Sequence, residues 1–178
     1  RRALASPPGY MSQLLPMDSL LHWFSGSDVA RRPDLLQLTL EVRPNGIPRV
    51  HAVVVECKFA QQNPVHVAEA RQQVQDGLRH LTGLLAPKCD DLRRLGFDRR
   101  FWWAQLHRAI TSRSVVNLPE QEWQALDHAL ENLAEGQFEI GWQGAIFTFW
   151  TNVPDSQPVV SALALPAGEF VRAPVPDN

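Results

Sequence analysis

Apolar residues recur along this chain with two different periods, and the change between them predicts a sheet covered by helices. Residues 34–42 and 50–59 are rich in leucine and valine and predict two strands. Asn45-Gly46 lies between them, a dipeptide that tolerates positive φ and favours a tight hairpin turn. Apolar residues occupy both faces of the second strand, which indicates a central strand covered on both sides. An antiparallel hairpin is therefore expected at the centre of the fold.

Four further segments show the spacing of three to four residues that is typical of amphipathic helices. They are residues 17–24, 67–85, 101–110 and 120–134. In the first of them Leu20, Leu21 and Phe24 form the packing side, and the preceding residues 1–16 are expected to be a linker. A strand pair followed by a helix that covers it predicts an α/β fold.

Aromatic residues gather in the last third of the chain. Residues 138–142 and 145–151 predict two strands around Gln143-Gly144, and hence an aromatic β-hairpin. Residues 159–165 predict a last edge strand. The α/β core is therefore expected to carry extra C-terminal helices and this hairpin.

Length and composition favour one domain. The 178 residues suit a single core, expected over about residues 17–86, with a C-terminal elaboration over about 98–165. No stretch is apolar enough to span a bilayer, no signal peptide is evident, and the first residue is not methionine. We therefore expect a cytoplasmic domain that belongs to a longer protein. Cys57 and Cys89 give no disulfide framework, and Cys57 is expected to be a buried apolar residue.

Charged residues follow the apolar run of the second strand. Glu56 and Lys58 are two positions apart, so their side chains share one face of a strand. Asp34 opens the first strand, and a hairpin places the start of one strand beside the end of the other. Burying such charges is costly unless they are paired or used. A surface salt bridge is the alternative, but it does not explain why three charges converge where two apolar strands meet.

The pattern Pro33-Asp34 followed by Glu56-Cys57-Lys58 resembles the PD-(D/E)XK nuclease superfamily. The strand, turn and strand between the two acids and the helix after them belong to the resemblance, which covers mainly residues 28–85. It implies a restriction-endonuclease-like mixed β-sheet core flanked by helices. The second half of the chain matches loosely and is similar to the C-terminal nuclease portions of large bacterial DNA-defence ATPases.

The resemblance implies an Mg²⁺-dependent endonuclease, with Mn²⁺ as a substitute metal. In that family two acidic residues, here Asp34 and Glu56, hold the metal, and the lysine, here Lys58, helps to position or activate the attacking water. The chemistry agrees, because a hard cation neutralises the phosphate and lowers the pKa of a bound water. The main-chain carbonyl of Cys57 is the expected third ligand.

Two further family features are matched only in part. Many members carry a glutamine on the helix after the lysine strand, and Gln72, Gln73 and Gln75 are candidates here. Gln73 is favoured because it lies beside the apolar face, and a solvated polar face is the alternative. Many members also have a glutamate on the first helix, where this chain offers only Asp18, with Asp28 in the loop that follows. One metal is therefore expected rather than two.

Basic residues cluster between Lys88 and Arg113, although the net charge of the chain is −2. Such a patch favours contacts to DNA phosphates, and a solvated helix face is the alternative. Trp102 and Trp103 in the same region offer rings for base stacking, but their helical spacing indicates core packing more often. The expected phosphate-contacting residues are Arg99, Arg100 and Arg108.

The sequence therefore predicts a DNA endonuclease domain, the effector of a bacterial restriction or anti-phage system. Its expected partners are DNA and the other domains or subunits of a larger defence complex, with no membrane; homo-oligomerisation stays open. A catalytically weak, nuclease-like module for DNA binding or assembly is the first alternative, favoured by the missing glutamate of the first helix. A secreted nuclease toxin domain is the second.

Overall fold

The computed structural model describes residues 11–25, 32–88, 98–112, 118–152 and 159–163. Within these residues the centre of the fold is a five-stranded mixed sheet in the order β1-β2-β3-β4-β5. Neighbouring strands are antiparallel except for β3 and β4, which run parallel. The strands are β1 (Met11–Pro16), β2 (Leu35–Glu41), β3 (Arg49–Ala60), β4 (Glu139–Trp150) and β5 (Val159–Leu163).

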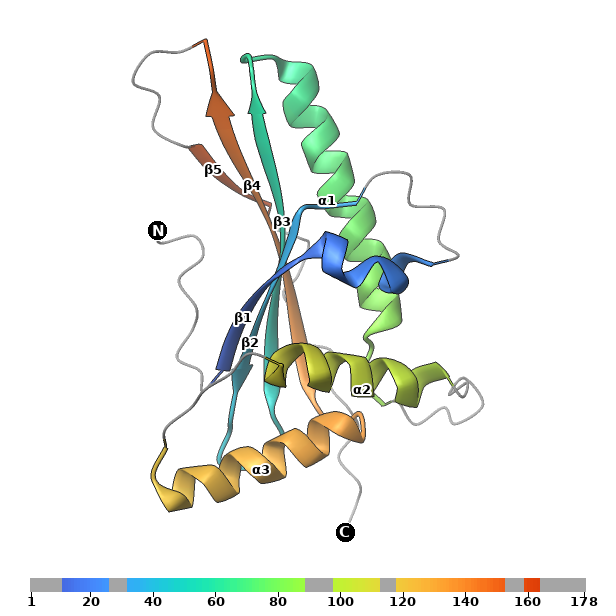
Figure 1. Cartoon of the computed structure of the whole chain (residues 1–178), viewed down its shortest axis with the longest axis vertical. Helices are drawn as coiled ribbons and strands as arrows, with labels where there is room; N and C mark the ends of the chain where they lie inside the picture. Colours follow the sequence, from blue (N-terminus) through green and yellow to red (C-terminus); the bar gives the residue numbers. More distant parts are fainter. Residues whose placement is uncertain (1–10, 26–31, 89–97, 113–117, 153–158, 164–178) are drawn as a thin grey trace.

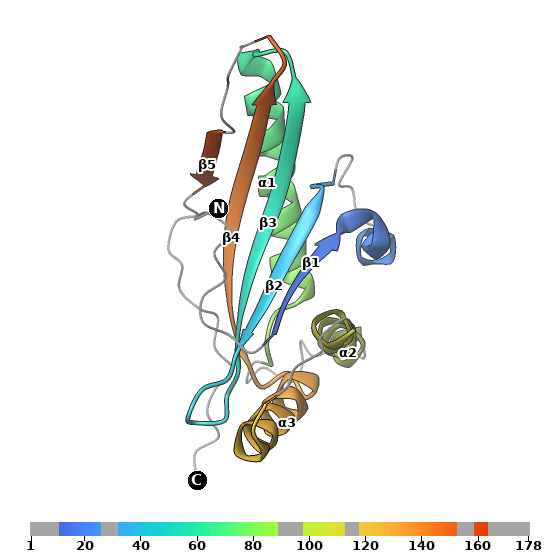
Figure 2. The same ribbon diagram turned by 60° about the vertical axis from the view of Figure 1, so that its left-hand side comes forward.

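The helices of the described residues gather on one side of the sheet (Figure 1 and Figure 2). Helix α1 runs along β3 and β4, while α2 packs against β1, β2 and α3. The α/β class expected from the sequence is confirmed. The helices are η2 (Met17–Phe24), a 3-10 helix, and the α-helices α1 (Pro64–Leu84), α2 (Asp98–Thr111) and α3 (Glu120–Ala134). None of these described helices has the length and apolar character needed to cross a membrane.

The core lies between the helices and the even-numbered face of β2 and β3. Leu36 stands opposite Val54 in the register of the two strands, and both side chains are fully buried. Helix α1 begins after Asn63, whose side chain accepts the N–H of Val65, and Pro64 occupies its first turn. The helix covers this face closely, because a Cβ added to Gly77 would lie 3.6 Å from Val54 Cγ1.

Two expectations about the N-terminal region are wrong. Residues 11–16 form a strand, not a linker, and their burial alternates along β1, with Leu15 buried and Leu14 49% exposed. The following helix is a 3-10 helix in which Leu20 and Phe24 are buried as expected, but Leu21 is 47% exposed, and Met17 and Trp23 are buried as well. A 3-10 helix repeats every three residues, so its buried side differs from the one that an α-helical spacing predicts.

The expected aromatic β-hairpin is also wrong. Residues 139–150 form one uninterrupted strand, β4, in which Gly144 stands opposite Val54 of β3 on one side and Leu163 of β5 on the other. Pairing with β3, and at Gly144 also with β5, holds Gln143-Gly144 in extended conformation. The last third of the chain therefore supplies a central strand of the sheet rather than an appendage.

Candidate metal and phosphodiester site

The hairpin of β2 and β3 brings Asp34 beside Glu56, as the sequence predicts. The ladder ends with Leu35 opposite Val55, and the Asp34 N–H donates to the Val55 carbonyl at 3.0 Å. Asp34 lies just beyond the last pair of the ladder, close enough for its charge to act on the Glu56 carboxyl. The Asp34 carboxylate is exposed, and its Oδ2 accepts the N–H of Cys57 at 2.7 Å.

The backbone around Asp34 is held from two sides. Its carbonyl accepts the N–H of Met17, the first residue of η2, at 2.8 Å. The preceding residue, Pro33, is buried against α1, where a Cβ added to Gly77 would lie 2.8 Å from Pro33 Cγ. This approach is possible only because the helix carries glycine at that position. Asp34 is therefore an exposed carboxylate on a fixed backbone.

Glu56 is buried, with 2% of its side chain exposed. Its Oε1 lies 2.7 Å from Lys58 Nζ, whereas its Oε2 has no hydrogen-bond partner among the described residues. Burial raises the pKa of the Glu56 carboxyl above its ordinary value of 4.5. The hydrogen bond and the charge of Lys58 and a hydrogen bond from the Asp34 backbone oppose this shift, whereas the charge of Asp34 adds to it. A buried carboxylate oxygen without a partner costs free energy, and a bound cation would offset that cost.

Lys58 connects the strand to helix α1. Its Nζ donates to Gln73 Oε1 at 2.7 Å, and Gln73 Nε2 donates to the Arg32 carbonyl at 3.4 Å. Of the three candidate glutamines, Gln73 is the one that contacts this group: Gln72 donates to Asp76 at 3.0 Å, and Gln75 is exposed. Short contacts thus join Glu56, Lys58 and Gln73, while Asp34 contacts the same strand through the Cys57 N–H.

Cys57 is exposed, so the expectation that it is buried is wrong. The physical reason is that β2 ends at Leu35, which leaves β3 to continue without a neighbour on that side. Partial burial of the sulfur and the charges of Asp34 and Glu56 raise the pKa of the Cys57 thiol, so it stays protonated near neutral pH. Its N–H points toward Asp34, and the carbonyl of a strand residue leaves on the same side as its N–H.

The donor set suits a hard cation with several water ligands. No group of three or more His, Cys, Asp or Glu side chains gathers around a common point in the part of the chain that the structure describes. Two carboxylates and a main-chain carbonyl fit Mg²⁺, which keeps waters in its shell, better than Zn²⁺, which takes more protein ligands. Asp18 is exposed on η2, and Asp28 lies outside the described residues.

The predicted arginines do not form one surface. Arg99 Nη1 donates to the Gly83 carbonyl at the end of α1, at 2.9 Å. Arg99 and Arg108 are nine positions apart on α2, and at about 100° per residue they lie on opposite sides of the helix. Arg100 and Arg108 are both exposed. The basic residues 93, 94 and 113 of the expected patch lie outside the described residues.

The neighbouring tryptophans pack inside the fold, which confirms core packing for Trp103. This residue is 3% exposed, and its Nε1 donates to the Ala86 carbonyl at 3.0 Å. Its ring lies against Gly136, where an added Cβ would be 2.5 Å away. Trp102 is partly buried and meets Trp23 edge to face, with 6.5 Å between the ring centroids. Trp103 is therefore not available for base stacking.

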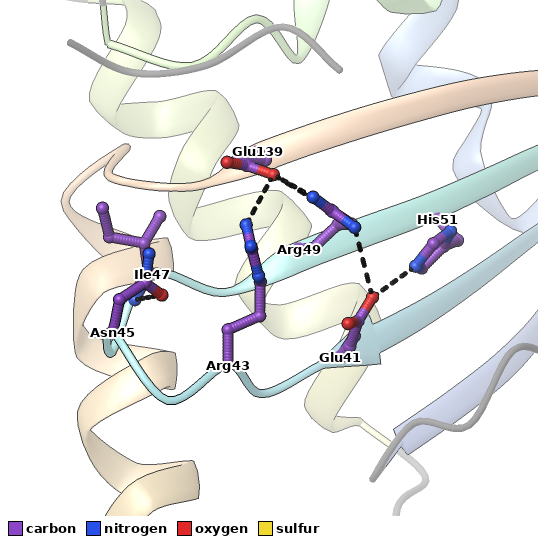
Figure 3. A network of polar contacts seen from close by, with 7 residues as sticks. All are labelled: Glu41, Arg43, Asn45, Ile47, Arg49, His51 and Glu139. Atoms are coloured by element: carbon purple, nitrogen blue, oxygen red, sulfur yellow. Dashed lines mark hydrogen bonds and ion pairs between the residues drawn. The ribbon is translucent and has the colours of Figure 1, made fainter. Parts of the chain in front are cut away.

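A second charged cluster, which sequence reasoning missed, lies at the hairpin end of the sheet (Figure 3). Arg49 and Arg43 both donate to Glu139 Oε2, at 2.8–3.0 Å, and His51 contacts Glu41 at 2.8 Å. The hairpin register alone pairs Glu41 with Arg49, but Glu139 arrives from the distant strand β4. Paired charges of this kind hold strands together, and we assign the cluster a structural role.

Comparison with protein-family models, with curated proteins and with solved structures finds no match to this chain. The geometry of the site and the sequence pattern that it contains are therefore the grounds for a function.

Proposed function

We propose that this chain is a metal-dependent nuclease domain, with a restriction-endonuclease-like core, that hydrolyses phosphodiester bonds in DNA. The observation that carries the proposal is the buried Glu56 carboxylate, whose Oε2 has no partner among the described residues and which lies next to the exposed Asp34. Lys58 adds a cation at the same point, 2.7 Å from Glu56 Oε1. Two acids that can hold a cation and a lysine beside them can supply the charge that phosphodiester hydrolysis needs.

Asp34, Glu56 and the Cys57 carbonyl would hold Mg²⁺, or Mn²⁺ in its place. When bound, such a cation supplies charge to neutralise the phosphate and to lower the pKa of a coordinated water. The chain contributes the position of these groups: Asp34 stays accessible, and the hydrogen bond from the Cys57 N–H fixes its carboxylate. Glu56 stays in place because Lys58 anchors its other oxygen.

Lys58 is proposed to act on the reacting phosphate. Its ammonium group stabilises negative charge that develops in the transition state and favours the ionised form of a nearby water. The Gln73 amide accepts one of its N–H groups at 2.7 Å, so α1 restricts the direction in which the ammonium points. Gln73 is therefore a positioning residue for Lys58.

The sequence resemblance supports a more specific setting. It suggests a DNA endonuclease that serves as the effector of a bacterial restriction or anti-phage system, within a longer protein or a larger complex, in the cytoplasm. The site geometry supports metal-dependent hydrolysis, whereas the defence role rests on the sequence resemblance and is proposed on that ground.

Cleavage of supercoiled plasmid and of single-stranded DNA tests the proposal. The wild-type chain is expected to cut with Mg²⁺ or Mn²⁺ and to stop when EDTA is added. Lys58→Ala is expected to lower the single-turnover rate on the order of 10²- to 10³-fold, which is typical for the loss of one group that stabilises transition-state charge. Undiminished cleavage by a folded Lys58→Ala variant would rule out the assignment of this site.

A DNA-binding or assembly module without activity is the second candidate. The observation in its favour is that the first helix offers only the exposed Asp18 as an acid near the site among the described residues. Calorimetric titration with Mn²⁺ separates the two candidates. Binding that disappears in Asp34→Asn and in Glu56→Gln supports the nuclease, whereas DNA binding without metal binding supports the module.

A further inference from the structure

A pocket of about 410 Å³ opens between η2 and α2, on the helical side of the sheet. Its size falls within the range of about 300–1,000 Å³ that is usual for small-molecule sites. His22 of η2 and Gln105 of α2 join the two walls through a contact of 3.3 Å between Nε2 and Oε1. The lining residues are Leu15, Ser19, Leu20, His22, Trp23, Gln105, Arg108, Ala109 and Ser112.

The lining combines an apolar floor with a polar rim. Leu20, Trp23 and Ala109 are at most 9% exposed and form the floor. Arg108 is exposed, and its guanidinium makes no ion pair with any described residue. Two hydroxyls, one imidazole and one amide complete the rim. Such a lining fits a ligand with one flat apolar part and one anionic part.

The floor also holds an unused hydrogen-bond donor. The indole Nε1 of Trp23 is buried and has no acceptor among the described residues, although the residue itself is 1% exposed. The Nε1 atom is closed off from solvent and hence from the pocket space, so Trp23 would meet a ligand with the apolar part of its ring.

The pocket is joined to the Asp34 site through η2. Met17, the first residue of η2, donates its N–H to the Asp34 carbonyl, and the pocket residues Ser19 and Leu20 follow two and three positions later. The helix η2 is kinked at Leu20, whose φ of −116° and ψ of 28° are not helical, so its axis does not run straight from Met17 to the pocket. The element that lines the pocket is still the one whose first N–H contacts Asp34, and a strand bound at both places would follow η2.

We propose that this pocket binds one nucleotide of a nucleic-acid strand, with the phosphate at Arg108 and the base on the apolar floor. The inference rests on the proposed nuclease function and adds to it a site that selects an unpaired nucleotide, since a base stacked inside a duplex cannot enter a pocket. The same chemistry would admit a free mononucleotide, and the experiment distinguishes the two sources.

Calorimetry in EDTA, where no cleavage is expected, tests the proposal on the full chain. The probes are a thymidine hexamer, thymidine 5′-monophosphate, and thymidine as the probe without phosphate. Arg108→Gln is expected to weaken hexamer binding at least about tenfold, because charge-assisted hydrogen bonds to a phosphate are lost. Arg79→Gln, an arginine of α1 that is 77% exposed and lies outside the pocket, is the matched control and should bind as the wild type does. Ser112→Trp fills the pocket from its exposed rim and should give the same loss as Arg108→Gln.

Binding of both phosphorylated probes would support the pocket as a general nucleotide site, and binding of the hexamer alone would support a strand-bound nucleotide. Absence of hexamer binding, or equal affinity of the Arg108→Gln and Arg79→Gln variants, would overturn the proposal. Glu56→Gln should keep the hexamer affinity while losing cleavage. Normal cleavage by Arg108→Gln would refute the nucleotide-binding role of the pocket and leave the nuclease function standing. Hexamer binding in the pocket without any cleavage by the wild type would refute the nuclease function and leave the binding role standing.

Discussion

Lys58 Nζ and Glu56 Oε1 lie 2.7 Å apart at the point where β3 leaves the core, and the two groups differ in their access to solvent. The Glu56 side chain is 2% exposed and the Lys58 side chain 20%. Loss of the partner should therefore cost more free energy for the buried Glu56 carboxylate than for the partly solvated Lys58 ammonium group.

This asymmetry predicts unequal effects of removing either partner. Lys58→Met should lower the free energy of unfolding by about 3 kcal/mol, because it leaves a buried carboxylate without a counter-charge. Glu56→Gln should cost less, since the remaining ammonium group is partly solvated. The double variant should recover most of the loss, and urea denaturation measures all three. If the two substitutions changed the free energy of unfolding additively, the result would contradict an energetic coupling between Lys58 and Glu56.

The raised pKa of Glu56 predicts a pH-dependent stability difference. Because the folded-state pKa lies above the unfolded value of 4.5, the folded state binds this proton more tightly. The stability that Glu56 contributes is therefore fully present below pH 4.5 and is lost as the pH rises through the folded-state pKa. The unfolding free energy of Glu56→Gln minus that of the wild type should increase over this range. If the unfolding free energies of the two proteins changed with pH in parallel, burial would not raise the pKa of the Glu56 carboxyl.

The same titration predicts how metal binding varies with pH. Mg²⁺ needs the ionised carboxylate, so its stabilising effect should be small near pH 4.5 and should grow as Glu56 loses its proton. Melting temperatures with Mg²⁺ and with EDTA measure this effect between pH 4.5 and pH 7.5. The Glu56→Gln variant should show no such rise, and a rise of equal size in that variant would place the metal elsewhere.

The contact of Gly77 with Pro33 predicts a long-range effect on the site. Gly77→Ala would place a Cβ 2.8 Å from Pro33 Cγ, so the ring and the adjoining Asp34 must shift. We expect a loss of about 1–3 kcal/mol from overpacking and a fall in cleavage rate. Gly83→Ala in the same helix has no atom within 4 Å of the added Cβ and should stabilise by up to about 1 kcal/mol. Equal cleavage rates for the two variants would contradict this account.

The charged cluster at the hairpin end should affect stability without affecting activity. Glu139→Gln weakens the contacts of Arg43 and Arg49 with a nearly buried carboxylate and should cost about 3 kcal/mol. Arg49 and Glu56 are seven positions apart on β3, or about 23 Å at the rise of a strand. Cleavage at a temperature where the variant is folded should match the wild-type rate. A loss of cleavage in the fully folded variant would show that this cluster belongs to the active site.

The sequence was sufficient to predict the local part of the site. The strands β2 and β3 pair as the predicted hairpin, and Gly46 has the expected positive φ of 76° in the loop between Glu41 and Arg49, so Asp34 and Glu56 lie at the same end of the pair. The glutamine that contacts Lys58 is also the predicted one, because an amphipathic helix after the strand places Gln73 beside its buried side.

Long-range pairing was the part that local patterns could not predict. Gln143-Gly144 has the composition of a turn, yet pairing with β3, and at Gly144 also with β5, holds it extended inside β4. The strand β1 was missed because it is only six residues long and gains its stability by pairing with β2. Glu139 joins Arg43 and Arg49 only because β4 returns parallel to β3.

The most direct test of the central claim is the single-turnover rate of DNA cleavage at saturating Mg²⁺ for three chains: the wild type, Glu56→Gln and Glu131→Gln. Glu131 is the matched control, since its side chain is 71% exposed on α3. We predict that Glu131→Gln cuts as the wild type does, whereas folded Glu56→Gln loses at least about 100-fold in rate. Equal rates for all three folded chains would contradict a metal-dependent site at Asp34, Glu56 and Lys58.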